Sequence, residues 1–171
     1  LETAKKSVVA YDLDPQQTLN DAADVRKEEG FNPELKVYTR YQKNTANADE
    51  VLIDVGTADM NAMKKALSIA DRVLLPVSPS QADIWSAQRF LFLVSSIKRD
   101  KPLQISAFIN RADTNRGVRE SDDAEAVLEN LPGLHVIKNR LCQRTAYRRS
   151  FSEGLGVFEL EPRSKAAHEF H

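Results

Sequence analysis

Six short apolar runs recur along the chain, and most of them are separated by segments with helical periodicity. Each run has the length and the β-branched or aromatic content of a buried strand. Strands are therefore predicted at Val8–Tyr11, Leu35–Tyr38, Val51–Ile53, Val73–Val77, Ile105–Ile109 and Leu134–Ile137. Strands that alternate with helices form a sheet covered on both faces. The predicted fold class is therefore α/β, a mostly parallel sheet flanked by helices on both faces in three layers.

Two of the predicted helices are preceded by residues that are typical of a helix N-terminus. Ser80 precedes Asp83 by three residues, a spacing that predicts an N-cap and a following helix. The broad apolar face expected for this helix comprises Ile84, Ala87, Leu91 and Val94, flanked by Trp85, Phe90, Leu93 and Ile97. Ser121 is predicted to cap another helix. The first turn of that helix would contain three acidic residues, Asp122, Asp123 and Glu125, whose negative charges interact favourably with the helix dipole.

Composition narrows the class of protein further. The chain has 171 residues, of which 42% are hydrophobic and 29% charged, enough for one well-packed core. No apolar run approaches the roughly 18 residues of a membrane span. The single cysteine, Cys142, forms no internal disulfide, which is typical of a reducing cytoplasm. We expect one domain over residues 1–171 in the cytoplasm.

The first apolar run ends in two aspartates and a proline, Asp12, Asp14 and Pro15. In open α/β sheets the carboxyl edge binds ligands, and Mg²⁺ prefers oxygen ligands together with substrate phosphates. This pattern predicts a nucleotide and magnesium site. The structural alternative is that these aspartates are turn or helix-cap residues.

A net charge of −1 conceals a local asymmetry, because residues 131–152 contain no acidic side chain. Solvated faces usually mix both signs, so this segment is predicted to bind DNA phosphates. Arg144 and Arg148 would share a helix face if Gln143–Glu153 is helical. The alternative is that the basic side chains pair with acids elsewhere, for instance Glu159 or Glu161. The basic residues are Lys138, Arg140, Arg144, Arg148 and Arg149.

Five segments in the correct order resemble the ParA/MinD group of deviant Walker ATPases, most closely the small ParA proteins that partition plasmids. The first segment is similar to switch I, the second to Walker B running into switch II, and the last to the C-terminal block of that group. The segments are residues 12–16, 51–57, 73–80, 108–111, and 143–147 with 154–159. The resemblance runs nearly end to end and implies a P-loop NTPase-like fold.

The resemblance also implies roles in phosphoryl transfer, where positioning and charge neutralisation dominate. Asp14 would orient or deprotonate the water that attacks the γ-phosphate. Asp12 would support the shell of ligands around Mg²⁺, and Asp54 would hold the ion through water. Gly56 would let the backbone approach the γ-phosphate, although the Asp-x-Pro-Pro of the family's switch II is absent. At the adenine base the resemblance places Asn110 and Pro162, with ordinary turn roles as the alternative.

For the whole protein the resemblance implies an ATPase cycle with ATP and Mg²⁺ as cofactors. ATP would lock a homodimer, which would bind DNA nonspecifically on the nucleoid. A centromere-binding, ParB-like partner would then stimulate hydrolysis. The function expected from the resemblance is partition of a plasmid or chromosome.

One departure from the family concerns the P-loop, K-G-G-x-G-K-[ST], which no stretch of the 171 residues supplies. Its amides and lysines are the main electrostatic contribution to phosphate binding, so the chain alone is expected to be inactive. We expect a strand and a glycine-rich loop before Leu1–Lys6, which is typical of the last turn of a helix. Residues 39–50 are expected to be an abbreviated crossover or to lack a segment, and Ser164–His171 to be a helix cut short.

Three other functions fit part of this pattern. A MinD-like membrane-associated ATPase would carry a basic amphipathic helix at its C-terminus. A related ATP-dependent synthetase would need substrate-binding residues that the sequence does not reveal. A scaffold or DNA-binding regulator without a P-loop is the non-enzymatic alternative.

Overall fold

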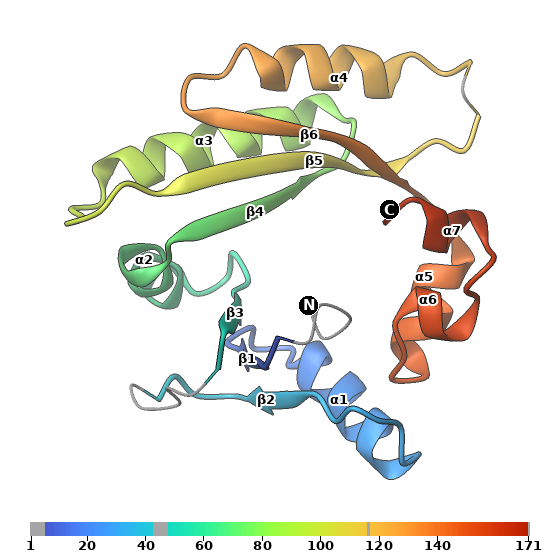
Figure 1. Cartoon of the computed structure of the whole chain (residues 1–171). Coiled ribbons are helices and arrows are strands. Elements are labelled where there is room, and N and C mark those ends of the chain that lie inside the picture. Colours follow the sequence, from blue (N-terminus) through green and yellow to red (C-terminus); the bar gives the residue numbers. More distant parts are fainter. Residues whose placement is uncertain (1–5, 43–47, 116, 171) are drawn as a thin grey trace. The chain divides into compact units, whose positions relative to one another are not determined.

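The computed structural model describes residues 6–42, 48–115 and 117–170, which form two compact units (Figure 1). The first unit comprises Leu1–Ala66 and Arg148–Leu160, and the second comprises Leu67–Tyr147 and Glu161–His171. The predictions for residues 1–5 and 43–47, at the start of the chain and in the crossover, lie outside the described residues.

The first unit is built on a parallel sheet of order β2-β1-β3. Its strands are β1 (Val8–Asp12), β2 (Lys36–Tyr38) and β3 (Glu50–Asp54), and α1 (Thr18–Glu28) packs against β1 and β2. The helix α2 (Met60–Ile69) begins in this unit, and α5 (Thr145–Ser152) ends in it before α6 (Val157–Leu160). The register of β1 and β3 places Asp12 directly beside Asp54. Two carboxylates therefore lie at one carboxyl edge.

The second unit is built on a parallel sheet of order β4-β5-β6. Its strands are β4 (Arg72–Val77), β5 (Gln104–Ala112) and β6 (Leu134–Cys142). The helix α3 (Gln81–Ser96) packs against β4, and α4 (Glu120–Glu129) packs against β5, β6 and α3. The short helix α7 (Lys165–His168) follows near the C-terminus. Apolar side chains from the strands and from α3 and α4 form the core, including Val77, Ile84, Ala107, Ile109 and Leu128.

All six predicted strands are present, and the α/β class with parallel strands and flanking helices is confirmed. The N-cap at Ser80 is also confirmed, because its Oγ accepts a hydrogen bond of 3.1 Å from the Asp83 amide. Of the apolar face predicted for α3, Ile84 and Ala87 are buried, whereas Trp85 is exposed.

Two predicted helix starts are wrong. The helix α4 begins at Glu120, and Ser121 lies buried inside it rather than capping it. No side chain caps α4, and acidic residues in its first turn supply the favourable interaction with the dipole instead. The helix α5 begins at Thr145, so Arg144 precedes the helix.

A buried arginine on α1 bonds to residues 154 and 159, in the C-terminal segment 148–160 of the first unit. Arg26 is 8% exposed, and its guanidinium forms a bidentate pair with Glu159, with both N–O distances at 2.9 Å. It also donates to the carbonyl oxygens of Pro33 and Gly154. Gly154 has φ +67°, and a Cβ there would lie 2.5 Å from the Arg26 amide nitrogen. Only glycine fits this close approach.

Within the described part of the chain, none of the helices has the length and apolar character that crossing a bilayer requires.

Candidate functional site

Asp12 is buried at the carboxyl end of β1. Its side chain is 1% exposed, and its two oxygens accept hydrogen bonds from the amides of Asp14 at 3.2 Å and Asn20 at 3.0 Å. The second bond reaches the first turn of α1, where amides lack helical partners. Asp12 therefore fixes both the loop after β1 and the start of the next helix.

Asp14 lies in a compact turn directly against Gly56. Its Oδ1 accepts a hydrogen bond of 2.8 Å from the Gln16 amide, and its carbonyl accepts one of 3.0 Å from Gln17. A Cβ at position 56 would overlap the Asp14 carboxylate, with its Cγ only 2.9 Å away. Glycine is therefore required at position 56 for this carboxylate to keep its place.

Asp54 completes a group of three carboxylates in this unit. Its carbonyl accepts a hydrogen bond of 2.9 Å from the Leu13 amide, which ties the two strand ends together. Burial, followed by the charges of Asp12 and Asp14, raises the pKa of Asp54. Negative charge thus accumulates at this edge, as expected where a cation binds.

The donor set fits Mg²⁺ held largely through water. Among the described residues, no group of three His, Cys, Asp or Glu side chains is arranged to hold a metal ion by itself. Mg²⁺ usually keeps several waters and takes only one or two carboxylates together with substrate phosphates. Asp54 suits this role as the carboxylate at the strand end, while Asp12, with both oxygens already accepting hydrogen bonds, suits an outer shell.

The partial desolvation of Asp54 and the repulsion among these carboxylates give a stability prediction. Asp54→Asn should raise the melting temperature without added metal by about 2 °C, because it removes one charge from the group. A raised pKa means that the folded state disfavours the charged form. The gain should therefore be full at pH 7 and disappear as the pH falls below the ordinary aspartate value of 3.8.

Thermal melting at pH 7 and pH 3 checks this prediction, with Asp49→Asn as the matched control. Asp49 accepts hydrogen bonds from the Ser7 amide and hydroxyl, which lower its pKa. The control should therefore melt at a lower temperature than the wild type. A fall in melting temperature for Asp54→Asn as well would contradict the repulsion.

Asn110 and Pro162 belong to the second unit. Asn110 lies in β5, where its Oδ1 accepts a hydrogen bond of 3.0 Å from the Arg111 amide, and Pro162 is exposed. Of the residues predicted for the nucleotide site, the first unit brings together Asp12, Asp14, Asp54 and Gly56. The roles of Asn110 and Pro162 at an adenine base remain predictions.

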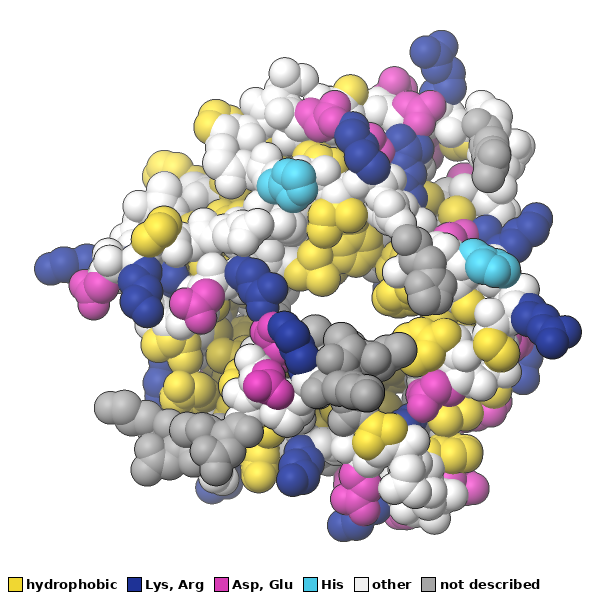
Figure 2. Space-filling view, viewed as in Figure 1, with side chains coloured by type: hydrophobic (Ala, Val, Ile, Leu, Met, Phe, Trp, Pro, Cys, Tyr) yellow, Lys and Arg dark blue, Asp and Glu magenta, His cyan; other side chains and the backbone are white. Residues whose placement is uncertain are grey.

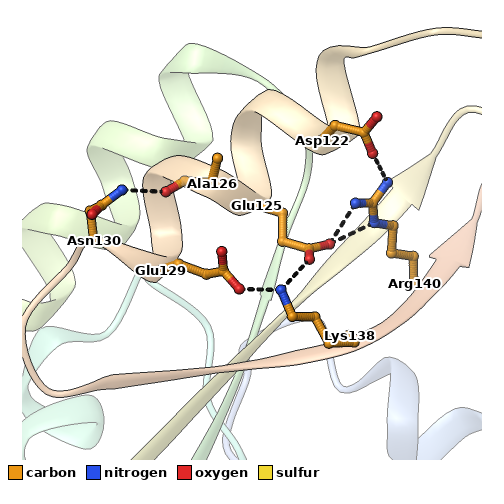
Figure 3. A network of polar contacts seen from close by, with 7 residues as sticks. All are labelled: Asp122, Glu125, Ala126, Glu129, Asn130, Lys138 and Arg140. Carbon is orange, nitrogen blue, oxygen red and sulfur yellow. Dashed lines mark hydrogen bonds and ion pairs between the residues drawn. The ribbon is translucent and has the colours of Figure 1, made fainter.

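Lys138 and Arg140 on β6 reach acidic side chains of α4 (Figure 3). Lys138 Nζ lies 2.7 Å from Glu125 and also pairs with Glu129. Arg140 bonds both Glu125 and Asp122, with distances of 2.6 to 2.8 Å. Burial would raise the pKa of Glu125, but the hydrogen bonds from these cations outweigh it and lower the pKa. Near α4, Figure 2 accordingly shows dark blue and magenta side chains side by side.

The remaining basic residues differ from one another in exposure. Arg144 pairs with Glu169 near the C-terminus, at 2.5 Å between Nη2 and Oε1. Arg148 and Arg149 on α5 are exposed, and Arg149 lies 3.8 Å from Glu153. The alternative considered for the sequence, that basic side chains of residues 131–152 pair with acids elsewhere, thus holds for four of the five, with partners that the sequence did not indicate. Glu159, considered as a partner, pairs with Arg26 instead.

Comparison with known proteins gives a consistent picture. No family model matches the chain. A curated relative, the maintenance of carboxysome distribution protein A of Halothiobacillus neapolitanus, is 25% identical over 177 residues, which cover 96% of this chain and 79% of that protein.

Solved structures share the fold. A ParA family ATPase from Chlorobium tepidum has a TM-score of 0.65 at 18% identity and covers 97% of this chain and 85% of its own. Apo McdA from Cyanthece has a TM-score of 0.77 at 15% identity, with coverages of 95% and 84%. A protein assigned to plasmid partition in Borrelia burgdorferi, bound to AMPPNP, has a TM-score of 0.67 at 16% identity, with coverages of 99% and 88%. The chain resembles the ParA/MinD group and has its fold.

Proposed function

We propose that this protein is a ParA-type positioning ATPase that binds ATP with Mg²⁺, forms a homodimer and binds DNA nonspecifically. The observation that carries the proposal is the Asp14 carboxylate seated on Gly56, next to Asp12 and to the strand end at Asp54. Relatives described as an ATPase and as bound to AMPPNP support the nucleotide.

In the proposed reaction Asp14 accepts a hydrogen bond from the attacking water and orients it in line with the γ-phosphate. Asp12 holds the loop that carries Asp14, through the amide of Asp14 itself. Asp54 would hold Mg²⁺ through its bound water. When bound, Mg²⁺ neutralises the charge that develops on the phosphate oxygens. Gly56 keeps space for the Asp14 carboxylate and for the backbone to approach the phosphate.

The phosphate-binding loop is proposed to come from sequence of the full polypeptide outside these 171 residues, because the P-loop motif does not occur in them. The edge position of β3 in the sheet of the first unit supports this proposal. Among the described residues β3 pairs with β1 alone, and Val51 and Leu52 are 47% and 48% exposed. Parallel strands normally lie inside a sheet, covered on both faces.

The cargo is proposed to be a DNA replicon or a large protein body that the dimer carries over the nucleoid with a partner protein that stimulates hydrolysis. The curated relative concerned with carboxysome distribution and the McdA structure favour a protein body as the second candidate beside a plasmid or chromosome. Capture with the purified full polypeptide and ATP separates the two. Recovery of a centromere-like DNA with its binding protein supports partition, whereas recovery of a DNA-free protein assembly supports the second candidate.

The full polypeptide should turn over ATP only with Mg²⁺ and should bind duplex DNA only with ATP. Turnover in EDTA, or a lack of turnover in a polypeptide that contains a P-loop, would contradict the proposed function. Size-exclusion chromatography with a nonhydrolysable ATP analogue should show a dimer. Co-sedimentation with anionic vesicles in place of DNA would point instead to the MinD-like alternative.

Two of the proposed DNA-binding residues, Arg148 and Arg149, are exposed on α5. Arg148→Glu combined with Arg149→Glu should weaken binding to any duplex and reduce the salt slope of log affinity by about 0.9 for each phosphate that is no longer bound. Replacing Arg149 should have little structural cost, since its pair with Glu153 is exposed and 3.8 Å long.

Fluorescence anisotropy at several salt concentrations measures this effect. The matched control is Lys98→Glu combined with Lys101→Glu, which changes the charge equally on an exposed loop after α3. An equal decrease of affinity in the two double variants would mean that net charge, rather than α5, determines binding. Unchanged affinity with a lowered melting temperature would assign the arginines to stability.

A further inference from the structure

Three hydrogen-bond donors converge on the carboxylate of Glu169. The Cys142 amide donates to Oε2 at 3.0 Å, and Arg144 Nε donates to Oε1 at 2.7 Å. The Tyr147 hydroxyl lies 2.8 Å from Oε2 and shares its proton with the Ala166 carbonyl oxygen at 2.9 Å. The donors come from the end of β6, from the residue before α5, and from α5 itself. They form a small anion site whose occupant is a side chain of the same protein.

The site is more enclosed than an ordinary surface ion pair. The side chains of Arg144 and Glu169 are only 22% and 15% exposed. Burial would raise the pKa of Glu169, but the hydrogen bonds from Arg144, Cys142 and Tyr147 outweigh it and lower its pKa. Burial and the Glu169 carboxylate raise the pKa of Tyr147, so the phenol remains a donor. An anion with oxygen acceptors is therefore strongly favoured here.

We propose that the Arg144 guanidinium, the Cys142 amide and the Tyr147 hydroxyl form a binding site for a DNA backbone phosphate, and that Glu169 competes with DNA for it. This inference rests on the nonspecific DNA binding of the proposed function. A guanidinium binds the oxygens of a phosphate in the same bidentate manner as those of a carboxylate. All of the groups in this site, including Glu169, belong to the second unit.

Glu169 thereby makes duplex binding weaker than the basic residues alone would give. A phosphate must displace the carboxylate, so the free energy of the internal pair is subtracted from the free energy of DNA binding. Any contact of a partner or of a second subunit that draws the segment around α7 away would release Arg144. The site is thus an autoinhibitory element near the C-terminal end of the chain.

The decisive variant is Glu169→Gln, which removes the charge and keeps the shape. In the full polypeptide with ATP we expect about tenfold tighter binding to a random duplex, and a salt slope of log affinity steeper by about 0.9. The added substitution Arg144→Gln should abolish both gains. Glu169→Asp, whose carboxylate is shorter, should give an intermediate affinity and guards against misfolding of the first variant. Asp100→Asn makes the same charge change on an exposed loop and serves as the control.

If Glu169→Gln and Glu169→Asp bind duplex DNA no more tightly than Asp100→Asn, the proposal is overturned. DNA binding by the wild type would be unaffected by that result. If no variant binds duplex, the proposed DNA binding has failed, and inorganic phosphate then decides the anion site. In Glu169→Gln, added phosphate should raise the melting temperature more than chloride at equal ionic strength, and Arg144→Gln should remove the difference. Equal melting temperatures in the two salts would overturn the site.

Discussion

Replacing Asp14 with alanine is expected to lower ATP turnover of the full polypeptide by about 10²- to 10⁴-fold, the usual contribution of a positioned general base. ATP-dependent dimerisation should remain largely intact, because affinity for the nucleotide comes mainly from contacts with the phosphates and the base. The fold should also tolerate the change, since Asp14 lies in a turn whose backbone bond to Gln17 does not need the side chain. Turnover from a coupled ATPase assay and dimer formation by light scattering measure the two effects.

Two further variants sharpen the test of Asp14. Asp14→Asn keeps the shape on Gly56 but cannot take a proton, so its turnover should be nearly as low as that of Asp14→Ala. Gly56→Ala should lower turnover while Asp14 is unchanged, because a Cβ at position 56 overlaps the Asp14 carboxylate. Wild-type turnover in Asp14→Ala would remove this residue from the reaction. Loss of dimerisation together with turnover would show that Asp14 acts on binding instead.

The carboxylate group at the strand ends of the first unit could be predicted from the sequence because its determinants are local. Asp12 and Asp54 each end an apolar run, and parallel strands end at the same edge of a sheet, so their proximity follows from two short patterns. The contact between Asp14 and Gly56 joins two loops, and only the resemblance to a known family indicated Gly56. The helix starts were harder, because α4 relies on the charges of its first turn rather than on a capping side chain.

The surface charges could not be predicted in the same way. The segment of residues 131–152 contains no acid, yet four of its cations have carboxylate partners outside the segment. Arg144 and Glu169 are 25 positions apart, and Arg26 and Glu159 are 133 apart. No periodicity relates residues at such separations, so only the folded chain shows which cations are paired. A basic segment in a sequence is therefore weak evidence of a basic surface.

The pair of the buried Arg26 and the more exposed Glu159 should contribute to the stability of the first unit. Glu159→Ala leaves a guanidinium that is 8% exposed without its carboxylate, and leaving a buried polar group without its partner typically costs about 1 to 3 kcal/mol of the free energy of unfolding. The carbonyl oxygens of Pro33 and Gly154 still accept hydrogen bonds from Arg26, so the loss should fall short of complete unfolding. Glu153→Ala is the matched control, because the Glu153 carboxylate pairs with Arg149 in an exposed contact.

Urea unfolding followed by circular dichroism measures these changes, and the pH dependence separates the ion pair from simple packing. The hydrogen bond from Arg26 lowers the pKa of Glu159, so the pair stabilises the folded state fully above the ordinary glutamate value of 4.5. Its contribution is lost as the pH falls further and the carboxylate takes up a proton. The difference between wild type and Glu159→Gln should therefore be constant from pH 8 to pH 6 and shrink below pH 4.5. If the difference in the free energy of unfolding persists unchanged at pH 3, Glu159 stabilises the first unit through its shape and not through its charge.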